Sequence, residues 1–153
     1  MITTGDIAPD FTLPRDGGTD ISLSALRPQR VVLFFYPKTG TTNCAIEADD
    51  FNAALSAFAA AGATLIGLSK DPVKAQEKAV KKQALGYALV SDAEADACER
   101  YGVWVEKSMY GKAYMGIERA TYLIGADGRV ARAWHKVKVE GHVAEVLAAV
   151  QAL

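Results

Sequence analysis

A continuous apolar run over residues 31–35, VVLFF, constrains the fold of this 153-residue chain most strongly. A run of consecutive β-favouring residues predicts a strand covered on both faces, and Pro37 ends it because proline supplies no hydrogen-bond donor to a sheet. From Asn43 the apolar residues follow the helical period, which predicts a helix of about 18 residues that stops at Gly62. Residues 63–68 then predict a second buried strand.

The following segments continue the alternation of strands and helices. Asp71 as an N-cap and Pro72 at the first helical position predict another helix. Further along we expect a short strand near residues 88–90, a helix from Ser91 or Asp92 to Gly102, an irregular segment over residues 103–116, and a hairpin of residues 120–124 and 130–134 around Asp127-Gly128. A last helix has one apolar face, formed by Val143, Val146, Leu147, Val150 and Leu153.

This order of elements predicts an α/β fold with a mixed central sheet flanked by helices. The β-α-β units imply parallel strands joined by right-handed crossovers. Upstream of them, residues 8–14 alternate like a short edge strand before a turn at residues 16–18. Half of the residues are apolar and no repeat, linker or low-complexity tract interrupts the chain, so we expect a single domain over residues 1–153.

The charge balance and the apolar pattern of the chain argue against nucleic acid and membrane as partners. Seventeen basic and eighteen acidic residues give a formal net charge of -1, so no global positive field attracts nucleic acid. The start of the chain lacks the features of an export signal, and no apolar run is long enough to span a bilayer. We therefore expect a cytoplasmic protein that binds neither nucleic acid nor membrane.

Two further patterns favour ordinary structural roles. Lysines recur every four residues at Lys70, Lys74, Lys78 and Lys82 and predict a basic stripe on one helix, which we interpret as a solvated face because no aromatic platform accompanies it. His135 and His142, with two distant cysteines, make a poor ligand set, so we predict no metal.

The two cysteines, Cys44 and Cys98, form neither a disulfide framework nor a CxxC motif. Cys44 follows Asn43, a good N-cap residue, and the helix N-terminus stabilises a thiolate there by only about 0.3–1 kcal/mol. A reactive Cys44 therefore needs an arginine from elsewhere in the fold; otherwise it is a small buried residue at a helix start. Cys98 lies in the helix before Gly102, where a small apolar core residue is expected.

The string FFYPKTGTTNCAIE over residues 34–47 resembles the active-site loop of peroxiredoxins, in which a P-x-x-x-T-x-x-C motif follows a strand. Residues 101–104 (YGVW) and 109–124 (MYGKAYMGIERATYLI) extend the similarity to the bacterioferritin-comigratory, or Q-type, peroxiredoxins along essentially the whole chain. The resemblance implies a thioredoxin-like fold with an N-terminal extension. It places Pro37, Thr41, Cys44 and Arg119 at the four positions of the peroxiredoxin site.

The resemblance also implies a reaction. The Cys44 thiolate attacks hydrogen peroxide or an organic hydroperoxide and becomes a sulfenic acid, while Arg119 stabilises the developing charge. The Thr41 hydroxyl hydrogen-bonds the peroxide, and Pro37 shields the pocket. The implied protein is a monomer without a cofactor, reduced by a thiol donor such as thioredoxin, glutaredoxin or glutathione.

The sequence departs from the family pattern at two positions. Thr42 replaces the usual proline before the cysteine, and Asp49 stands five residues after Cys44, where many members carry a resolving cysteine. The nearby disulfide therefore cannot form. Two alternatives remain: Cys98 resolves the sulfenic acid after a large rearrangement or from a second molecule, or an external thiol reduces it in a one-cysteine cycle.

Two rival functions accompany the peroxidase hypothesis. The changed loop and the missing nearby cysteine are compatible with a weakly catalytic redox-sensing or interaction protein on the same scaffold. A thiol–disulfide oxidoreductase is disfavoured because the CxxC motif is absent.

Overall fold

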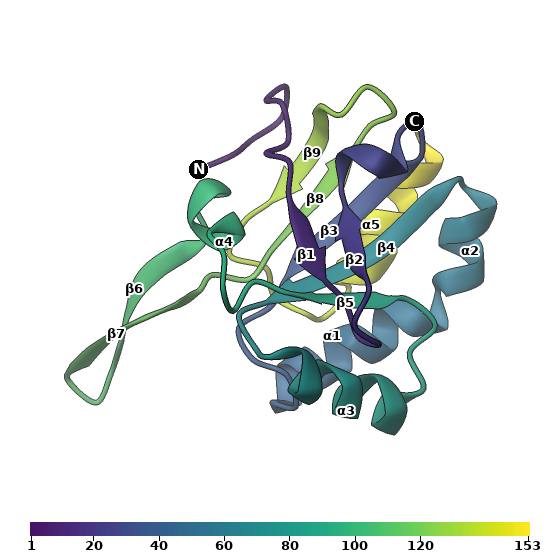
Figure 1. Cartoon of the computed structure of the whole chain (residues 1–153). Helices are drawn as coiled ribbons and strands as arrows, with labels where there is room; N and C mark the ends of the chain where they lie inside the picture. The colour runs from purple at the N-terminus through teal and green to yellow at the C-terminus, as the bar shows by residue number, and fades with distance from the viewer.

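A five-stranded mixed sheet forms the centre of the computed structural model, which describes residues 1–153 (Figure 1). Its strands are β3 (Arg30–Phe35), β4 (Ala63–Ser69), β5 (Ala88–Ser91), β8 (Ala120–Ile124) and β9 (Val130–Trp134), in the order β5-β4-β3-β8-β9. β3 and β5 pair parallel with β4, whereas β8 pairs antiparallel with both β3 and β9. The predicted α/β fold with a mixed sheet is confirmed.

The sheet separates the core into two clusters. In the central strand β3, Val31, Leu33 and Phe35 join one cluster, whereas Val32 and Phe34 join the other, as the alternation of side chains in a strand requires. The helices α1 (Thr42–Ala53), α2 (Leu55–Ala60), α3 (Val73–Gln83) and α5 (His142–Gln151) contribute to the second cluster. The N-terminal segment and α4 (Ala97–Arg100) cover the opposite face.

Two small antiparallel hairpins lie outside the central sheet. β1 (Thr12–Pro14) pairs with β2 (Asp20–Ser22), so only part of the expected edge strand over residues 8–14 is a strand, and the 3-10 turn Ser24–Leu26 follows. β6 (Trp104–Met109) pairs with β7 (Lys112–Ile117), and this hairpin extends away from the sheet (Figure 1). None of the helices combines the length and apolar character needed to cross a bilayer.

The prediction of an irregular segment over residues 103–116 is wrong, because β6 and β7 occupy it. Tyr110 and Gly111 both have positive φ, 53° and 77°, at the tip of this hairpin. Such angles match the twist of two-residue hairpin turns, but tyrosine rarely adopts them. The turn therefore carried only a weak signal in the sequence.

Three predicted helix boundaries also differ from the structure. The helix over residues 43–60 is interrupted at Ala54, whose N–H bonds to the Phe51 carbonyl and so tightens the turn. Pro72, not Asp71, is the N-cap of α3. The helix expected from Ser91 or Asp92 begins only at Ala97, because the Asp92 carboxylate accepts hydrogen bonds from the N–H groups of Ala97 and Cys98 and holds the preceding residues in a turn.

Candidate active site

Cys44 lies in the first turn of α1, directly beyond the carboxyl end of the central strand β3. Its side chain is 5% exposed. The N-cap is Thr41, two residues before the predicted Asn43, and its carbonyl accepts the first helical bond from Ala45 N–H at 2.9 Å. Asn43 therefore lies inside the helix, but the predicted placement of Cys44 in the positive end of a helix holds.

Arg119 supplies the cation that the sequence analysis required. Its Nη2 donates to Cys44 Sγ at 3.3 Å. Arg119 immediately precedes β8, and the antiparallel pairing of Ala120 with Phe35 brings it to the end of β3. The Arg119 carbonyl accepts a hydrogen bond from Val137 N–H at 3.0 Å, which fixes its backbone. A residue distant in sequence thus contacts the thiol through the strand register.

Glu47 is a site residue that no motif in the sequence singled out. It lies one turn after Cys44 on the same face of α1, and its Oε1 accepts a hydrogen bond from Arg119 Nη1 at 2.7 Å. The side chain is fully buried, and burial raises the pKa of Glu47 to about 7 although Arg119 lowers it in part. Glu47 therefore holds the guanidinium in position while carrying a proton-dependent charge near neutral pH.

The loop between β3 and α1 carries Pro37 and Thr41. Pro37 is half-buried, and the exposed Thr41 donates its hydroxyl proton to the Lys38 carbonyl at 2.8 Å. The Thr41 oxygen therefore keeps its lone pairs free as acceptors. The i,i+3 bond closes a turn that sets the position of the hydroxyl at the start of the helix.

Asp71 anchors this loop to the sheet. Its Oδ2 accepts hydrogen bonds from Thr39 N–H at 2.7 Å and from Ser69 Oγ at 2.8 Å, while the Tyr36 and Thr39 hydroxyls lie 3.0 Å apart. Ser91 donates its hydroxyl to the Asp71 carbonyl at 2.5 Å. The side chain that the sequence assigned to a helix cap therefore fixes the active-site loop against the ends of β4 and β5.

Cys98 lies on the other face of the sheet, away from Cys44. It belongs to the core cluster of Leu33 and Phe35, whereas Cys44 belongs to the cluster of Phe34, and both thiols are free. The central sheet therefore stands between the two sulfurs. The structure brings Arg119 to Cys44 but does not bring Cys98 there.

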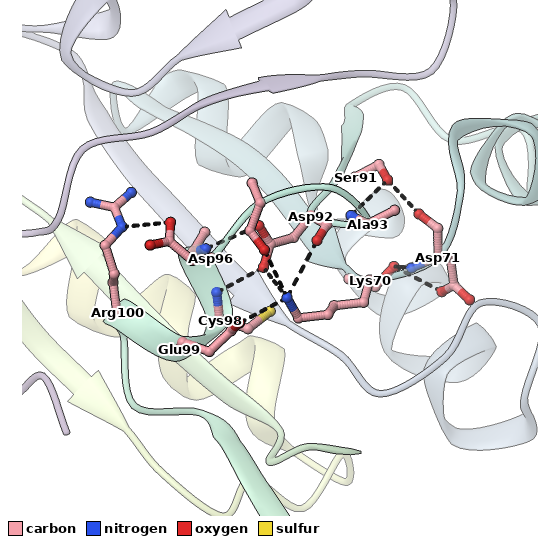
Figure 2. A network of polar contacts seen from close by, with 12 residues as sticks. Lys70, Asp71, Ser91, Asp92, Ala93, Asp96, Cys98, Glu99 and Arg100 are labelled. Atoms are coloured by element: carbon pink, nitrogen blue, oxygen red, sulfur yellow. Dashed lines mark hydrogen bonds and ion pairs between the residues drawn. The ribbon is translucent and has the colours of Figure 1, made fainter. Parts of the chain in front are cut away.

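A polar network centred on the buried Asp92 lies beside Cys98 (Figure 2). The fully buried Asp92 receives the Cys98 N–H at 2.9 Å and forms an ion pair with Lys70 at 3.1 Å. Lys70 also pairs with Glu99 at 2.7 Å and lies 5.1 Å from the centre of the Trp104 ring. Burial, reinforced by the Asp92 carboxylate, raises the pKa of the Cys98 thiol.

The remaining candidates lie apart from Cys44. Lys70 is outside α3 and engaged in this network, so the predicted stripe on one helix keeps only Lys74, Lys78 and Lys82, which are exposed. His142 is buried, its Nε2 lies 2.8 Å from Thr121 Oγ1, and burial lowers its pKa to about 4. His135 packs against Tyr122 instead. No group of three or more histidine, cysteine or acidic residues is placed to hold a metal ion.

Comparison with known proteins gives consistent matches along the chain. The sequence model of the AhpC/TSA family matches residues 4–133. The putative peroxiredoxin bcp of Coxiella burnetii is 47% identical over 146 residues, which cover 95% of this chain and 97% of that protein.

Solved structures agree with these sequence matches. A structure of the Xanthomonas campestris bacterioferritin comigratory protein, described in terms of its alkyl peroxide reduction activity, superposes with a TM-score of 0.90 at 41% identity and covers 99% of this chain and 97% of that chain. The peroxidoxin BcpB of Mycobacterium tuberculosis superposes with a TM-score of 0.89 at 34% identity, covering 100% and 99% of the two chains.

Proposed function

Because this chain belongs to the AhpC/TSA family and, within it, to the Bcp or Q-type peroxiredoxins, it is a thiol-dependent peroxidase, and we propose that Cys44 is its peroxidatic residue. One observation carries this proposal: Arg119 Nη2 donates to Cys44 Sγ at 3.3 Å. A fixed cation and the positive end of α1 both favour the thiolate, which is the nucleophilic form of a cysteine.

The first step consumes the peroxide. The Cys44 thiolate attacks one peroxide oxygen, an S–O bond forms and the O–O bond breaks, and the departing oxygen takes up a proton to leave as water or an alcohol. Arg119 stabilises the negative charge that develops on that oxygen. Hydrogen peroxide and organic hydroperoxides are the proposed substrates, in line with the alkyl peroxide activity described for the X. campestris protein.

Thr41, Pro37 and Glu47 prepare the site for this step. Because the Thr41 proton is engaged with the Lys38 carbonyl, the Thr41 oxygen accepts the O–H of the bound peroxide. Pro37 shields the pocket without adding a competing donor. Glu47 acts as a positioning residue, because it contacts Arg119 rather than the reacting sulfur.

We further propose that the cycle uses one cysteine. Cys98 belongs to the core cluster on the opposite face of the sheet and is 0% exposed, so a disulfide with Cys44 would require a large rearrangement of the fold. The sulfenic acid is reduced instead by an external thiol, from the class that includes thioredoxin, glutaredoxin and glutathione.

The setting of the reaction follows from the same residues. We propose that residues 1–153 act as one domain, as a monomer and in the cytoplasm, with neither nucleic acid nor membrane as a partner. Two free thiols suit a reducing compartment, and a net charge of -1 gives no general attraction to polyanions. An isolated β-bridge pairs Ile7 with Arg129, the residue that precedes β9, and so joins the N-terminal segment to the central sheet.

A matched pair of variants tests this function. Peroxide consumption is measured with hydrogen peroxide or cumene hydroperoxide and a thiol donor, for the wild type, Cys44→Ser and Cys98→Ser. We expect Cys44→Ser to lose turnover by about 10³-fold or more and Cys98→Ser to stay within about threefold of the wild type. Turnover that survives in Cys44→Ser would contradict the assignment, and turnover lost in Cys98→Ser would contradict the one-cysteine cycle.

A further inference from the structure

Two adjoining cavities lie between α1 and α3, and Cys44 lines the inner one. An inner pocket is lined by Cys44 and Ala48 from α1 and by Ala79 and Gln83 from α3. An outer groove shares Ala79 and Gln83 with it, together with Thr39 and Gly40 of the active-site loop. The inner pocket has a volume of about 10 Å³, which is room for about one water molecule, and it adjoins the outer groove through these four shared residues.

These cavities approach Cys44 from the side opposite to Arg119. Cys44 follows β3, the middle strand of the sheet; Arg119 precedes β8 on one side of β3, whereas α3 connects β4 and β5 on the other (Figure 1). Neither Arg119 nor Glu47 lines the inner pocket or the outer groove. The peroxide side and the groove side of the sulfur are therefore distinct.

The chemistry of reduction requires such an arrangement. A thiolate displaces the oxygen of a sulfenic acid by attacking sulfur in line with the S–O bond, from the side away from the oxygen. Because the peroxide oxygen is delivered on the Arg119 side, the thiolate must arrive from the groove side. An S–S bond then forms, the S–O bond breaks, and the departing hydroxide takes up a proton to become water.

The outer groove carries unpaired positive charge. Lys78 and Lys82 are exposed, stand one turn apart on α3, and take part in none of the ion pairs of the protein. The one carboxylate of the groove, Asp49, accepts a hydrogen bond from Gln83 Nε2 at 2.9 Å. The same nitrogen donates to the Ala45 carbonyl at 2.9 Å, so Gln83 spans the groove and narrows it.

We propose that the groove between α1 and α3 binds a small thiol that bears at least two carboxylates, and that Lys78 and Lys82 hold these carboxylates while its sulfur reaches Cys44. A small thiol fits better than a protein thiol because Cys44 is 5% exposed and Gln83 spans the entrance. A second thiol molecule then attacks the bound thiol's sulfur, releases the Cys44 thiolate and leaves as a disulfide. This inference rests on the proposed one-cysteine function.

The test compares thiols of different charge. Cys44 is first oxidised with one equivalent of hydrogen peroxide, and quenched intact-mass measurements then follow mixed-disulfide formation with glutathione, neutral 2-mercaptoethanol and cationic cysteamine at equal thiolate concentration. The groove variant is Lys78→Glu with Lys82→Glu. The matched control, Lys112→Glu with Lys138→Glu, changes the net charge equally at exposed lysines outside the groove.

We expect the rate ratio of glutathione to cysteamine to fall about tenfold or more in the groove variant and to change less than about threefold in the control, with the difference shrinking at high salt. An equal fall in both variants, an unchanged ratio in the groove variant, or reduction by thioredoxin but by none of the three small thiols would overturn the proposal. If the wild type forms no sulfenic acid at all, the proposed function fails instead, because that step precedes any thiol.

Discussion

Cys44 and Cys98 occupy similar places in the fold, but the charged side chain that contacts each cysteine has the opposite sign. Each lies near the start of a helix that follows a strand of the central sheet, and their side chains are 5% and 0% exposed. Arg119 contacts the sulfur of Cys44, whereas the Asp92 carboxylate lies against Cys98. A cation favours a thiolate, and an anion together with burial favours a thiol. The sign of the neighbouring charge, rather than helix position, separates the two cysteines.

The two environments also differ in how they are held together. Around Cys44 the cation is paired with Glu47, a group that titrates near neutral pH, whereas around Cys98 the ion pair joins Lys70 to the fully buried Asp92. The first arrangement keeps a charged group available to the sulfur. Around Cys98 the charged groups pair with one another, and the ion pairs of Lys70 connect α4 to the end of β4.

Removal of the cation beside Cys44 should have the largest effect on the reaction. We expect Arg119→Met to lower kcat/KM for peroxide by about 10²–10³-fold, because both the thiolate and the developing oxygen charge lose their partner. Stopped-flow measurement of sulfenic acid formation checks this. Arg100→Met, at an exposed arginine near Cys98, serves as the matched control. A rate within threefold of the wild type in Arg119→Met would contradict the claim that this cation distinguishes Cys44 from Cys98.

Removal of the cation near Cys98 should instead affect stability. Lys70→Met leaves the buried Asp92 carboxylate with backbone donors only, and we expect the free energy of unfolding to fall by about 2 kcal/mol. Urea denaturation measures this loss, with Lys74→Met as a control at an exposed lysine. Peroxide oxidation of Cys44 should keep its rate. A variant as stable as the wild type would show that the network around Cys98 is not structural.

The titration of Glu47 should make the Cys44 region sensitive to pH. Burial raises the pKa of Glu47 from 4.5 to about 7, so the folded state binds this proton more tightly than the unfolded state. The stability linked to this proton is fully present below the unfolded pKa of 4.5 and is lost as the pH rises through 7. It amounts to about 3 kcal/mol.

Glu47→Gln should remove this dependence. Urea unfolding between about pH 4.5 and pH 8 should show the wild type losing more stability with rising pH than the variant. The pKa of His142 is lowered to about 4, so its contribution to the free energy of unfolding is lost as the pH falls. This contribution is the same in both proteins, so the difference between their curves reports on Glu47. Parallel curves for the two proteins would contradict the assignment.

Loosening of the loop before Cys44 should have the smallest effect. Asp71→Ala removes the acceptor of Thr39 N–H, and we expect kcat/KM for peroxide to fall about tenfold, whereas Asp71→Asn keeps an oxygen acceptor and should stay within about threefold. Alkylation of Cys44 by iodoacetamide, which needs no peroxide pocket, should change little in either variant. Equal losses in peroxide rate and alkylation would point to general misfolding instead of lost positioning.

Much of the fold followed from local patterns in the sequence. The apolar run at residues 31–35, the Asp127-Gly128 hairpin and the order of the α/β elements were all correct, because periodicity and turn chemistry act over a few residues. The hairpin of β6 and β7 was missed because Tyr110 is an unusual residue for a positive φ. Asp71 was read as a cap because only the folded sheet brings Thr39 within reach of it.

The sequence predicted some residues of the candidate site and missed others. The resemblance identified Cys44 and Arg119, and the strand register then placed them in contact. Glu47 was not identified, because a sequence cannot show that Arg119 would pair with it across the fold. Its spacing of three residues from Cys44 on one helix was the available signal.

Intact mass spectrometry under non-reducing conditions tests most directly whether the two cysteines differ as described. Reduced wild type, Cys44→Ser and Cys98→Ser each receive one equivalent of hydrogen peroxide. We expect one added oxygen atom in the wild type and in Cys98→Ser, and none in Cys44→Ser. Loss of two hydrogen atoms that requires both cysteines, or an oxygen adduct on Cys98 in Cys44→Ser, would contradict it.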